Sequence, residues 1–290
     1  MRRLLCRLHR EQRGAVLVLV SLALVALVVM LALAIDGGYA YAQRRRMQNA
    51  ADAAAMAGAR TRALGGNDAQ VEAAITQYAT ANGADGTNWT CPDGQTVRVT
   101  AWRVFPTFFA GIAGLPQMTA SATAEASMQY LSAASDLLPM VVKIDNFVIG
   151  QTYQLWENSL EAPGNYGWVD WDGVPVGDQE LAYNILHPSN SGYWEIGNLI
   201  PGAPGVKEGS SVEEALSTWI GQHVTIPFYD LIIGTGANTK YRVAGFGEFV
   251  LDGYNFGSSV KYVVGHFIRW VEQGPGGGPN RGLASVKLTA

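Results

Sequence analysis

Residues 15–35 read AVLVLVSLALVALVVMLALAI, with no charged residue and with Ser21 as the only polar side chain. At about 1.5 Å per residue, a helix of this length spans roughly the 30 Å hydrocarbon thickness of a bilayer. The stretch therefore predicts a single transmembrane helix over residues 15–35, preceded by a cytoplasmic tail over residues 1–14. The remainder of the 290-residue chain is long enough for one large or two modest domains.

Arginines flank the apolar stretch unevenly. Arg2, Arg3, Arg7, Arg10 and Arg13 precede it, and Arg44, Arg45 and Arg46 follow it. Because the short flank with more positive charge tends to stay in the cytoplasm, we expect a cytoplasmic N-terminus and an extracytoplasmic C-terminal region in a single-pass protein of the cell membrane. The small residues Ala32 and Ala34 leave signal-peptide cleavage as an alternative, but the apolar core exceeds the usual length, which favours a retained anchor.

Charge and cysteine usage narrow the possible partners. The formal net charge is −4, although eight of the 20 basic residues lie within the first 46 positions. The body is therefore acidic, with scattered lysines and arginines, and this argues against nucleic acid as a partner.

Cys6 and Cys91 lie on opposite sides of the apolar stretch, so no intramolecular disulfide is expected. Cys91 is interpreted as a small half-buried residue rather than a reactive thiol.

Small residues recur at helical spacing after the span, which predicts that the helix continues out of the membrane. They are Met47, Ala50, Ala51, Ala54, Ala57 and Gly58. Such a face allows another backbone to approach closely, although a high helix propensity of alanine alone would also explain it. We expect residues 39–51 to meet a partner helix and residues from 54 onward to meet a sheet of the same chain.

A small helix-on-sheet domain is expected over residues 36–130. Residues 65–66 are glycines that end the first helix, and Asn67 with Gln70 predicts a capped second one, giving a kinked or two-piece helical stalk. Turn residues predict a loop over 84–94, and alternation predicts strands over 96–104 and 117–128. A short helix started by proline is expected over 106–114. One face of the second strand carries Met118, Ala120, Ala122, Ala124, Ala126 and Met128, which suits an alanine-rich helix.

Residues 131–137 are interpreted as a linker, followed by a mainly β domain over residues 138–290 with one or two covering helices. The expected strands lie at 140–149, 153–157, 224–231, 240–251, 260–271 and 283–289, with 260–271 in a central position. Ser211 and Glu214 match a capping box, which predicts a helix beginning there. The fold class is therefore α+β: a transmembrane helix, a helical stalk with a small sheet, and a mainly β C-terminal domain.

Oxygen ligands of the kind that calcium prefers gather in a glycine-rich loop. They are Asn165, Asp170, Asp172, Asp178 and Glu180. Their spacing does not fit an EF-hand, where the glycine follows a third acidic position. A solvated acidic loop is the preferred interpretation, with a calcium site as the alternative.

Motifs for catalysis and cofactor binding are absent from the sequence. His187, His223 and His266 are scattered singly, with no zinc, thiol or serine-nucleophile motif around them. We therefore expect no enzyme activity and no cofactor. An aromatic group could form a platform for a sugar or a protein, although such residues are more often core. It comprises Tyr166, Trp168, Trp171, Tyr193 and Trp194.

The N-terminal stretch resembles the N-terminal module of the Flp (Tad) pilus-assembly proteins of the TadE/TadG-like family, over about residues 13–60. The likeness consists of an Arg-Gly start, a long apolar span, an Asp-Gly pair, a tyrosine, a basic patch and a Gln-Asn-Ala-Ala-Asp-Ala-Ala run. The residues that carry it are Arg13, Gly14, Asp36, Gly37, Gln48, Asn49, Ala50, Ala51, Asp52, Ala53, Ala54, Ala55, Gly58 and Ala59.

The resemblance implies a pseudopilin-like or accessory membrane protein of a Flp/Tad pilus or related surface secretion system. It implies a pilin-like helix-plus-sheet domain, and partners among other pilus-assembly proteins that bind through the N-terminal helix. One position departs from processed pilins, which carry Glu at the fifth place after the cleaved glycine, where this chain has Leu19. A membrane-tethered binding module or adhesin that uses the C-terminal β domain is the alternative.

Overall fold

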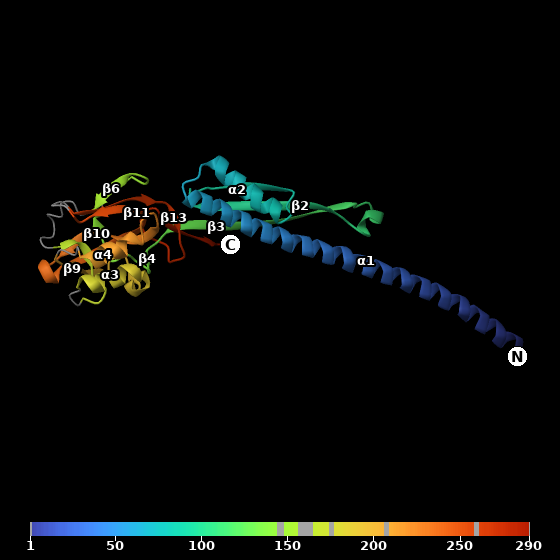
Figure 1. Cartoon of the computed structure of the whole chain (residues 1–290). Coiled ribbons are helices and arrows are strands. Elements are labelled where there is room, and N and C mark those ends of the chain that lie inside the picture. The colour runs from blue at the N-terminus through green and yellow to red at the C-terminus, as the bar shows by residue number, and fades with distance from the viewer. Residues whose placement is uncertain are drawn as a thin grey trace.

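A long helix projects from one end of an elongated body, which contains two successive sheets (Figure 1). The computed structural model describes residues 2–143, 148–155, 165–173, 177–205, 209–257 and 261–289. A small helix-on-sheet unit lies beside the long helix, and a mainly β unit lies beyond it. The expected α+β class is confirmed.

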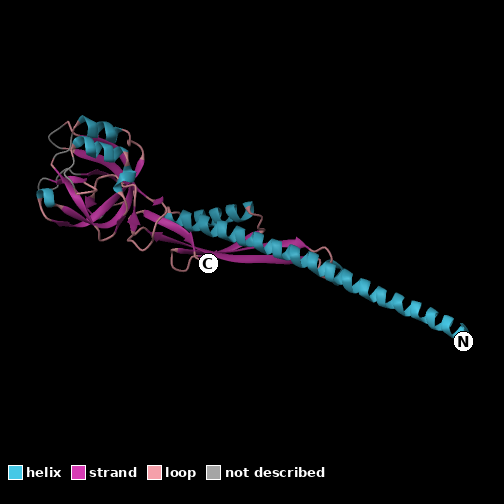
Figure 2. Ribbon diagram, turned by 90° about the horizontal axis from the view of Figure 1, so that it is seen from below, coloured by secondary structure: helices cyan, strands magenta, loops and turns pink. Residues whose placement is uncertain are grey.

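Helix α1 runs without interruption over Arg2–Ala63. Within the described part of the chain it is the one helix long and apolar enough to cross a membrane, which fits a single-pass anchor. Its first half stands free of the body, whereas its second half lies along the sheet (Figure 2). Nearly every side chain between Val16 and Ile35 is exposed, so this part of α1 has no protein core of its own.

The first sheet has the order β1-β2-β3-β14-β13. Its strands are β1 (Gly86–Thr90), β2 (Thr96–Pro106), β3 (Gln117–Tyr130), β14 (Leu283–Leu288) and β13 (Trp270–Val271). The pairs β1–β2, β2–β3 and β3–β14 are antiparallel, and β13 and β14 are parallel. Strands β2 and β3 form one long hairpin, in register from Thr96 opposite Ser127 to Pro106 opposite Gln117.

Alanine side chains form most of the contact between α1 and this sheet. Met47, Ala50, Ala51, Ala54, Ala55 and Ala59 are fully buried with Val97, Val99 and Ala101 of β2 and Ala126 of β3. Helix α2 (Asp68–Ala81) is capped by Asn67 and Gln70 in the expected reciprocal way, and it buries Val71 and Ile75 in the same core. The stalk is thus two-piece, with α2 packed against α1.

Two local expectations in the first sheet are wrong. Residues 84–94 are not wholly a loop, because β1 pairs with β2 along its full length, from Gly86 opposite Trp102 to Thr90 opposite Arg98. Residues 106–114 are not a helix started by proline. Pro106 ends β2, where its missing N–H breaks the ladder, and only a single 3-10 turn, η1 (Ala110–Ala113), follows.

The second sheet has the order β5-β10-β11-β12-β6, and β9 pairs with both β11 and β7. The bounds are β5 (Val142–Lys143), β6 (Thr152–Leu155), β7 (Asn165–Val169), β9 (Leu199–Pro204), β10 (His223–Ile233), β11 (Lys240–Asn255) and β12 (Tyr262–Ile268). Strand β12 lies between β11 and β6, in agreement with its expected central position. The expected strand over 260–271 is nevertheless too long, because β12 ends at Ile268 and Trp270–Val271 form β13 of the first sheet, while residue 260 lies outside the described residues.

Helices α3 (Asp178–Leu186) and α4 (Ser210–Ser217) pack together over this second sheet. The short elements η2 (Pro188–Ser191), η3 (Gly236–Asn238), β4 (Ala133–Ala134) and β8 (Trp194–Glu195) complete the unit. The expected capping box at Ser211 is wrong. Gly209 is the N-cap and makes no side-chain bond, while its own N–H donates to Asp178 Oδ2 at 2.9 Å.

The C-terminal strand corrects the expected assignment of residues 283–289 to the second sheet. Strand β14 pairs with β3 of the first sheet, where Ala284 is opposite Tyr130. Residues 131–137, which were expected to form a linker, are packed into the structure. Leu131, Ala133 and Leu137 are buried, and β4 pairs with β8. Of the expected strand over 140–149, the described part contains only β5, and residues 144–147 lie outside the described residues.

Candidate functional site

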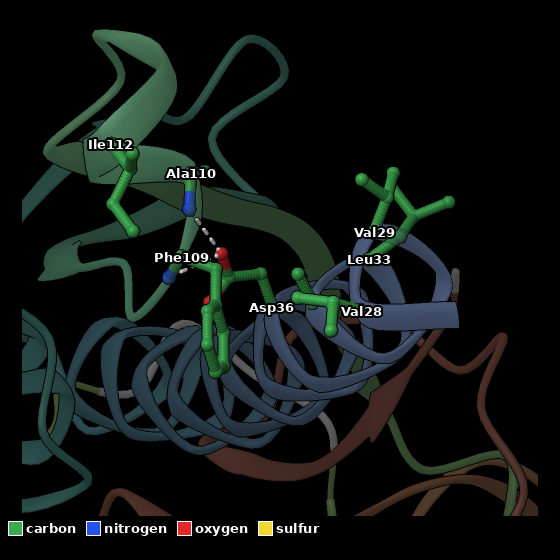
Figure 3. Close-up of a pocket in the computed structure, with 8 residues that line it drawn as sticks. Val28, Val29, Leu33, Asp36, Phe109, Ala110 and Ile112 are labelled. Carbon is green, nitrogen blue, oxygen red and sulfur yellow. Dashed lines mark hydrogen bonds between the residues drawn. The ribbon is translucent and has the colours of Figure 1, made fainter. Parts of the chain in front are cut away.

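The carboxylate of Asp36 joins α1 to the tip of the β2–β3 hairpin, here called the hairpin tip and comprising residues 106–116. Asp36 Oδ1 accepts the N–H of Phe108 at 2.8 Å. Its Oδ2 accepts the N–H of Phe109 at 2.9 Å and that of Ala110 at 2.6 Å. Figure 3 shows the carboxylate between the helix and these amides. One side chain thus satisfies three successive backbone donors.

The amides also decide the charge of Asp36. Its side chain is 8% exposed, and desolvation alone would raise its pKa. The N–H groups of Phe108, Ala110 and Phe109 outweigh that effect and hold the pKa below its ordinary value. Asp36 is therefore a carboxylate at neutral pH, and the negative charge strengthens its hydrogen bonds.

Aromatic packing reinforces the junction one turn further along α1. The ring of Tyr39 lies edge-on to Phe105 of β2, with 5.3 Å between the ring centroids. It lies 5.3 Å from the ring of Phe108 in the same manner. Edge-to-face pairs of this geometry contribute about 0.5–1.5 kcal/mol each beyond their buried area. The tip is therefore held by a polar contact and an apolar one.

An apolar groove of about 610 Å³ runs between α1 and the hairpin tip. Its helix wall consists of Val28, Val29, Ala32, Leu33 and Asp36, and its other wall consists of Phe109, Ala110 and Ile112. The view in Figure 3 places Ile112 across from Val28, Val29 and Leu33. The groove thus opens where the apolar stretch meets the folded body.

The residues after Arg46 in the motif of the N-terminal stretch build the contact between helix and sheet. Gln48 Nε2 donates to Asp52 Oδ1 at 2.8 Å on the same helix. Gly58 permits a close approach, because a Cβ there would lie 2.9 Å from Ile75 and 3.0 Å from Val97. Asn49 and Gly37 are exposed. Arg13 and Gly14 fall within α1. The alanines of the motif belong to the buried set described above, except Ala53, which is half-buried.

Comparison with known families supports this reading of the N-terminal stretch. Residues 14–61 match the family model described as putative Flp pilus-assembly TadE/G-like. The resemblance stated from the sequence is confirmed. No curated protein and no solved structure matches the chain. The TadE/G-like stretch thus covers the apolar helix and its alanine face, and it ends two residues before α1 does.

The TadE/G-like alanine face meets the protein's own sheet over its whole length. This differs from the expectation that residues 39–51 meet a partner helix, because Met47, Ala50 and Ala51 are fully buried within the chain. Tyr41 remains 72% exposed. The surfaces of α1 that remain open to another protein are therefore the apolar stretch itself and the exposed side of the segment that follows it.

The calcium candidates are divided between a strand end and a helix. Asp170 follows β7 and is buried, and this burial raises the pKa of its carboxyl to about 6, with Asp172 and Glu180 adding to the shift. Asp178 and Glu180 lie in the first turn of α3, and Asp178 accepts the Gly209 N–H. Asn165 begins β7. Among the described residues, no group of three or more His, Cys, Asp or Glu side chains is arranged to hold a metal ion.

The three histidines lie apart and each has a local partner. His223 contacts the buried Glu248, His266 Nδ1 lies 2.9 Å from Asp252, and His187 stacks on Tyr183.

The aromatic group is not one platform. Trp168 is 2% exposed, and Trp171 and Trp194 pack with each other in a core cluster. Tyr193 is 58% exposed. Cys91 is half-buried against the first core, as expected.

Sequence reasoning missed the hairpin tip as a functional element. The available signal was the run from Val104 to Ala124, which contains no charged residue although it lies outside the apolar span. The second signal was the single acidic residue, Asp36, directly after the span. Neither signal shows that Asp36 contacts the hairpin tip, because the residues in contact are more than 70 positions apart in the sequence.

Proposed function

We propose that this protein is a membrane-anchored structural or assembly component of a Flp/Tad-type pilus or a related surface secretion system, of the pseudopilin-like kind. The TadE/G-like match supports a role related to Flp pilus assembly. The observation that carries the proposal further is the continuity of α1, which passes from the exposed apolar stretch into the core of the first sheet without a break.

Continuity makes the anchor and the body one mechanical unit. Beyond the apolar stretch, Asp36 and Tyr39 bind α1 to the β2–β3 hairpin. The alanine face then packs α1 against the first sheet. A rigid link of this kind presents the body at a fixed height and direction from the membrane, as a scaffold component requires. A tethered binding module would need no such link, because a flexible linker serves a tether equally well.

We propose a cytoplasmic N-terminus and an extracytoplasmic body, on the arginine bias given above. Protease added to intact spheroplasts is then expected to remove the residues after about position 36. Full protection of the body would contradict this orientation.

A genetic experiment tests the assembly role. In the native host, deletion of the gene is expected to abolish or strongly reduce surface pili, and the intact gene is expected to restore them. A variant in which residues 15–35 are replaced by an unrelated apolar sequence separates two roles: failure to restore pili indicates that the span binds partners, and restoration indicates that it only anchors. A deletion strain with normal pili would contradict the assembly role.

The adhesin alternative makes a different prediction for the same strain. Pili would form normally, while attachment to a surface would be lost. Of the aromatic residues that could form a sugar platform, only Tyr193 is largely exposed in the described part of the chain, so the geometry favours the assembly role.

A further inference from the structure

The hairpin tip lies beside the part of α1 that the membrane would enclose. The helix wall of the groove begins at Val28, and at about 1.5 Å per residue Val28 lies about 10 Å before the end of the span at residue 35. The opposite wall is Ile112 together with Phe109 and Ala110. A bilayer that covers residues 15–35 must therefore reach the hairpin tip as well.

The exposed surface of the tip matches such a location. Phe108, Ile112 and Leu115 are 62%, 88% and 61% exposed. No charged residue occurs between Arg103 and Glu125 in the sequence. A cluster of large apolar side chains at the end of a hairpin, which no element of the described residues covers, is expected to associate with an apolar phase.

Backbone hydrogen bonding pairs seven N–H groups of the tip, which lowers the cost of a lipid environment, where unpaired N–H groups are costly. The N–H groups of Phe108, Phe109 and Ala110 donate to Asp36. Those of Thr107, Ile112, Gly114 and Leu115 donate to carbonyl oxygens inside the tip. Pro106 and Pro116 carry no N–H, and the hydroxyl of Thr107 donates to the Leu115 carbonyl at 2.6 Å.

Polar side chains return further along α1, beyond the end of the span. A second groove, of about 500 Å³, lies further along α1. Arg44, Tyr41, Thr119 and Ser121 are among its lining residues. Arg44 lies about 12 Å beyond Asp36 along the helix. The change from an apolar to a mixed lining follows the expected change from hydrocarbon to headgroup.

We infer that the hairpin tip is a second membrane-embedded element, which inserts Phe108, Ile112 and Leu115 into the hydrocarbon of the leaflet at the C-terminal end of the span. Lipid acyl chains occupy the groove between Val28 and Ile112. Asp36 acts as the tether that keeps the tip at this depth. The inference rests on the proposed membrane anchor, and it adds a second contact that fixes the rotation of the body about α1.

Fluorescence quenching by lipids tests the inference on the full chain. The native cysteines are replaced (Cys6→Ser and Cys91→Ala), and an environment-sensitive nitrobenzoxadiazole label is attached to Ile112→Cys, Leu24→Cys or Ser217→Cys in separate samples. The protein is reconstituted in phosphatidylcholine and phosphatidylglycerol vesicles, with or without doxyl-labelled phosphatidylcholine. Leu24 reports on the span, and Ser217, on the exposed side of α4, reports on water.

Labels at Ile112 and Leu24 are expected to show blue-shifted emission and strong quenching by doxyl lipid, whereas a label at Ser217 shows neither. Asp36→Asn is expected to reduce quenching at Ile112 and to leave quenching at Leu24 unchanged. If Leu24 is not quenched, the proposed anchor itself fails. If Leu24 is quenched while Ile112 is not, the tip is outside the membrane and this inference alone is overturned. Blue-shifted emission at Ile112 without quenching would also overturn it, because protein rather than lipid would then cover the tip.

Discussion

Asp36 Oδ2 lies 2.6 Å from the backbone nitrogen of Ala110, although the two residues are 74 positions apart in the sequence. The contact joins the end of an apolar helix to the turn of a long hairpin. It therefore converts two elements that would otherwise meet only through apolar packing into a junction with a defined position along the helix.

The junction is expected to depend on the charge of Asp36. In Asp36→Asn the side chain keeps one acceptor oxygen and gains an NH₂ group that points at backbone donors. Hydrogen exchange of the amides of Phe108 and Ala110 should become faster. Asp52→Asn is the matched control, since Asp52 lies on the same helix and accepts a bond from Gln48. Equal exchange in the wild type and Asp36→Asn would show that the three bonds do not hold the tip.

The same contact predicts a pH dependence. The amide donors lower the pKa of Asp36 in the folded protein, so the stabilisation is fully present above the unfolded value of about 3.9. It is lost as the pH falls through the lower folded value. Protection of the Phe108 amide, corrected for intrinsic exchange, is expected to be constant from neutral pH down to about 4 and to fall below it. A loss of protection that begins near neutral pH would point to a different group.

The alanine face predicts intolerance of larger side chains. Ala54 is fully buried between α1 and the sheet, so Ala54→Leu requires strain of about 1–3 kcal/mol, which is typical of overpacking. Ala73→Leu, on an exposed position of α2, is the control. Thermal unfolding in detergent should show a lower midpoint for Ala54→Leu alone. An unchanged midpoint would mean that the helix is not packed on its own sheet.

Strand β14 predicts that a change near the C-terminus weakens the N-terminal sheet. Ala284 is fully buried and lies opposite Tyr130 of β3. Ala284→Asp buries a charge without a partner, which should destabilise the protein by at least about 3 kcal/mol. Lys287→Asp places the same side chain on an exposed position of the same strand. Limited proteolysis should cut within β3 of the first variant and spare the second.

Asp170 predicts a pH effect of the opposite sign in the second sheet. Burial raises its folded pKa to about 6, so its contribution to stability is fully present below the unfolded value of about 3.9 and is lost as the pH rises through about 6. The melting midpoint of Asp170→Asn should therefore exceed that of the wild type at pH above 6, with Glu214→Gln as a surface control. If these carboxylates bind no calcium, millimolar calcium leaves the wild-type midpoint unchanged, and a clear rise would favour the calcium hypothesis.

Local pattern predicted the elements whose side chains repeat regularly. The alternating alanines of β3, the capping pair Asn67 and Gln70, and the apolar stretch each carry a periodic or reciprocal signal that survives in the fold. Strand β1 carries no such signal, because its residues are common in turns and its backbone is fixed by pairing with β2. Gly209 rather than Ser211 is the N-cap of α4, and the carboxylate of Asp178 in α3 accepts its N–H.

Local sequence patterns did not predict the contacts between segments that are far apart in the sequence. The resemblance identified Asp36 as a motif residue, yet nothing in its neighbours indicates that Phe108 and Phe109 provide its hydrogen-bond donors. Likewise, the apolar alternation of β14 predicts a strand but not the sheet that the strand joins. Both outcomes depend on which surfaces remain unpaired once the nearer elements have formed.

The return of β14 to β3 has a mechanical consequence. The chain leaves the first sheet after Tyr130 of β3 and returns to it at Trp270 of β13, which pairs with β14. Tyr130 and Leu283, the first residue of β14, lie at the same end of adjacent strands. A pull on the second sheet therefore reaches the first sheet at two places: β3 leads back covalently to α1, whereas β14 is held through its hydrogen bonds to β3. Along the strand direction it must slide β14 past β3 and break all of their hydrogen bonds together, which resists force better than opening them one at a time. The second sheet is thus held to the anchor both through the covalent chain of β3 and through the hydrogen bonds between β14 and β3.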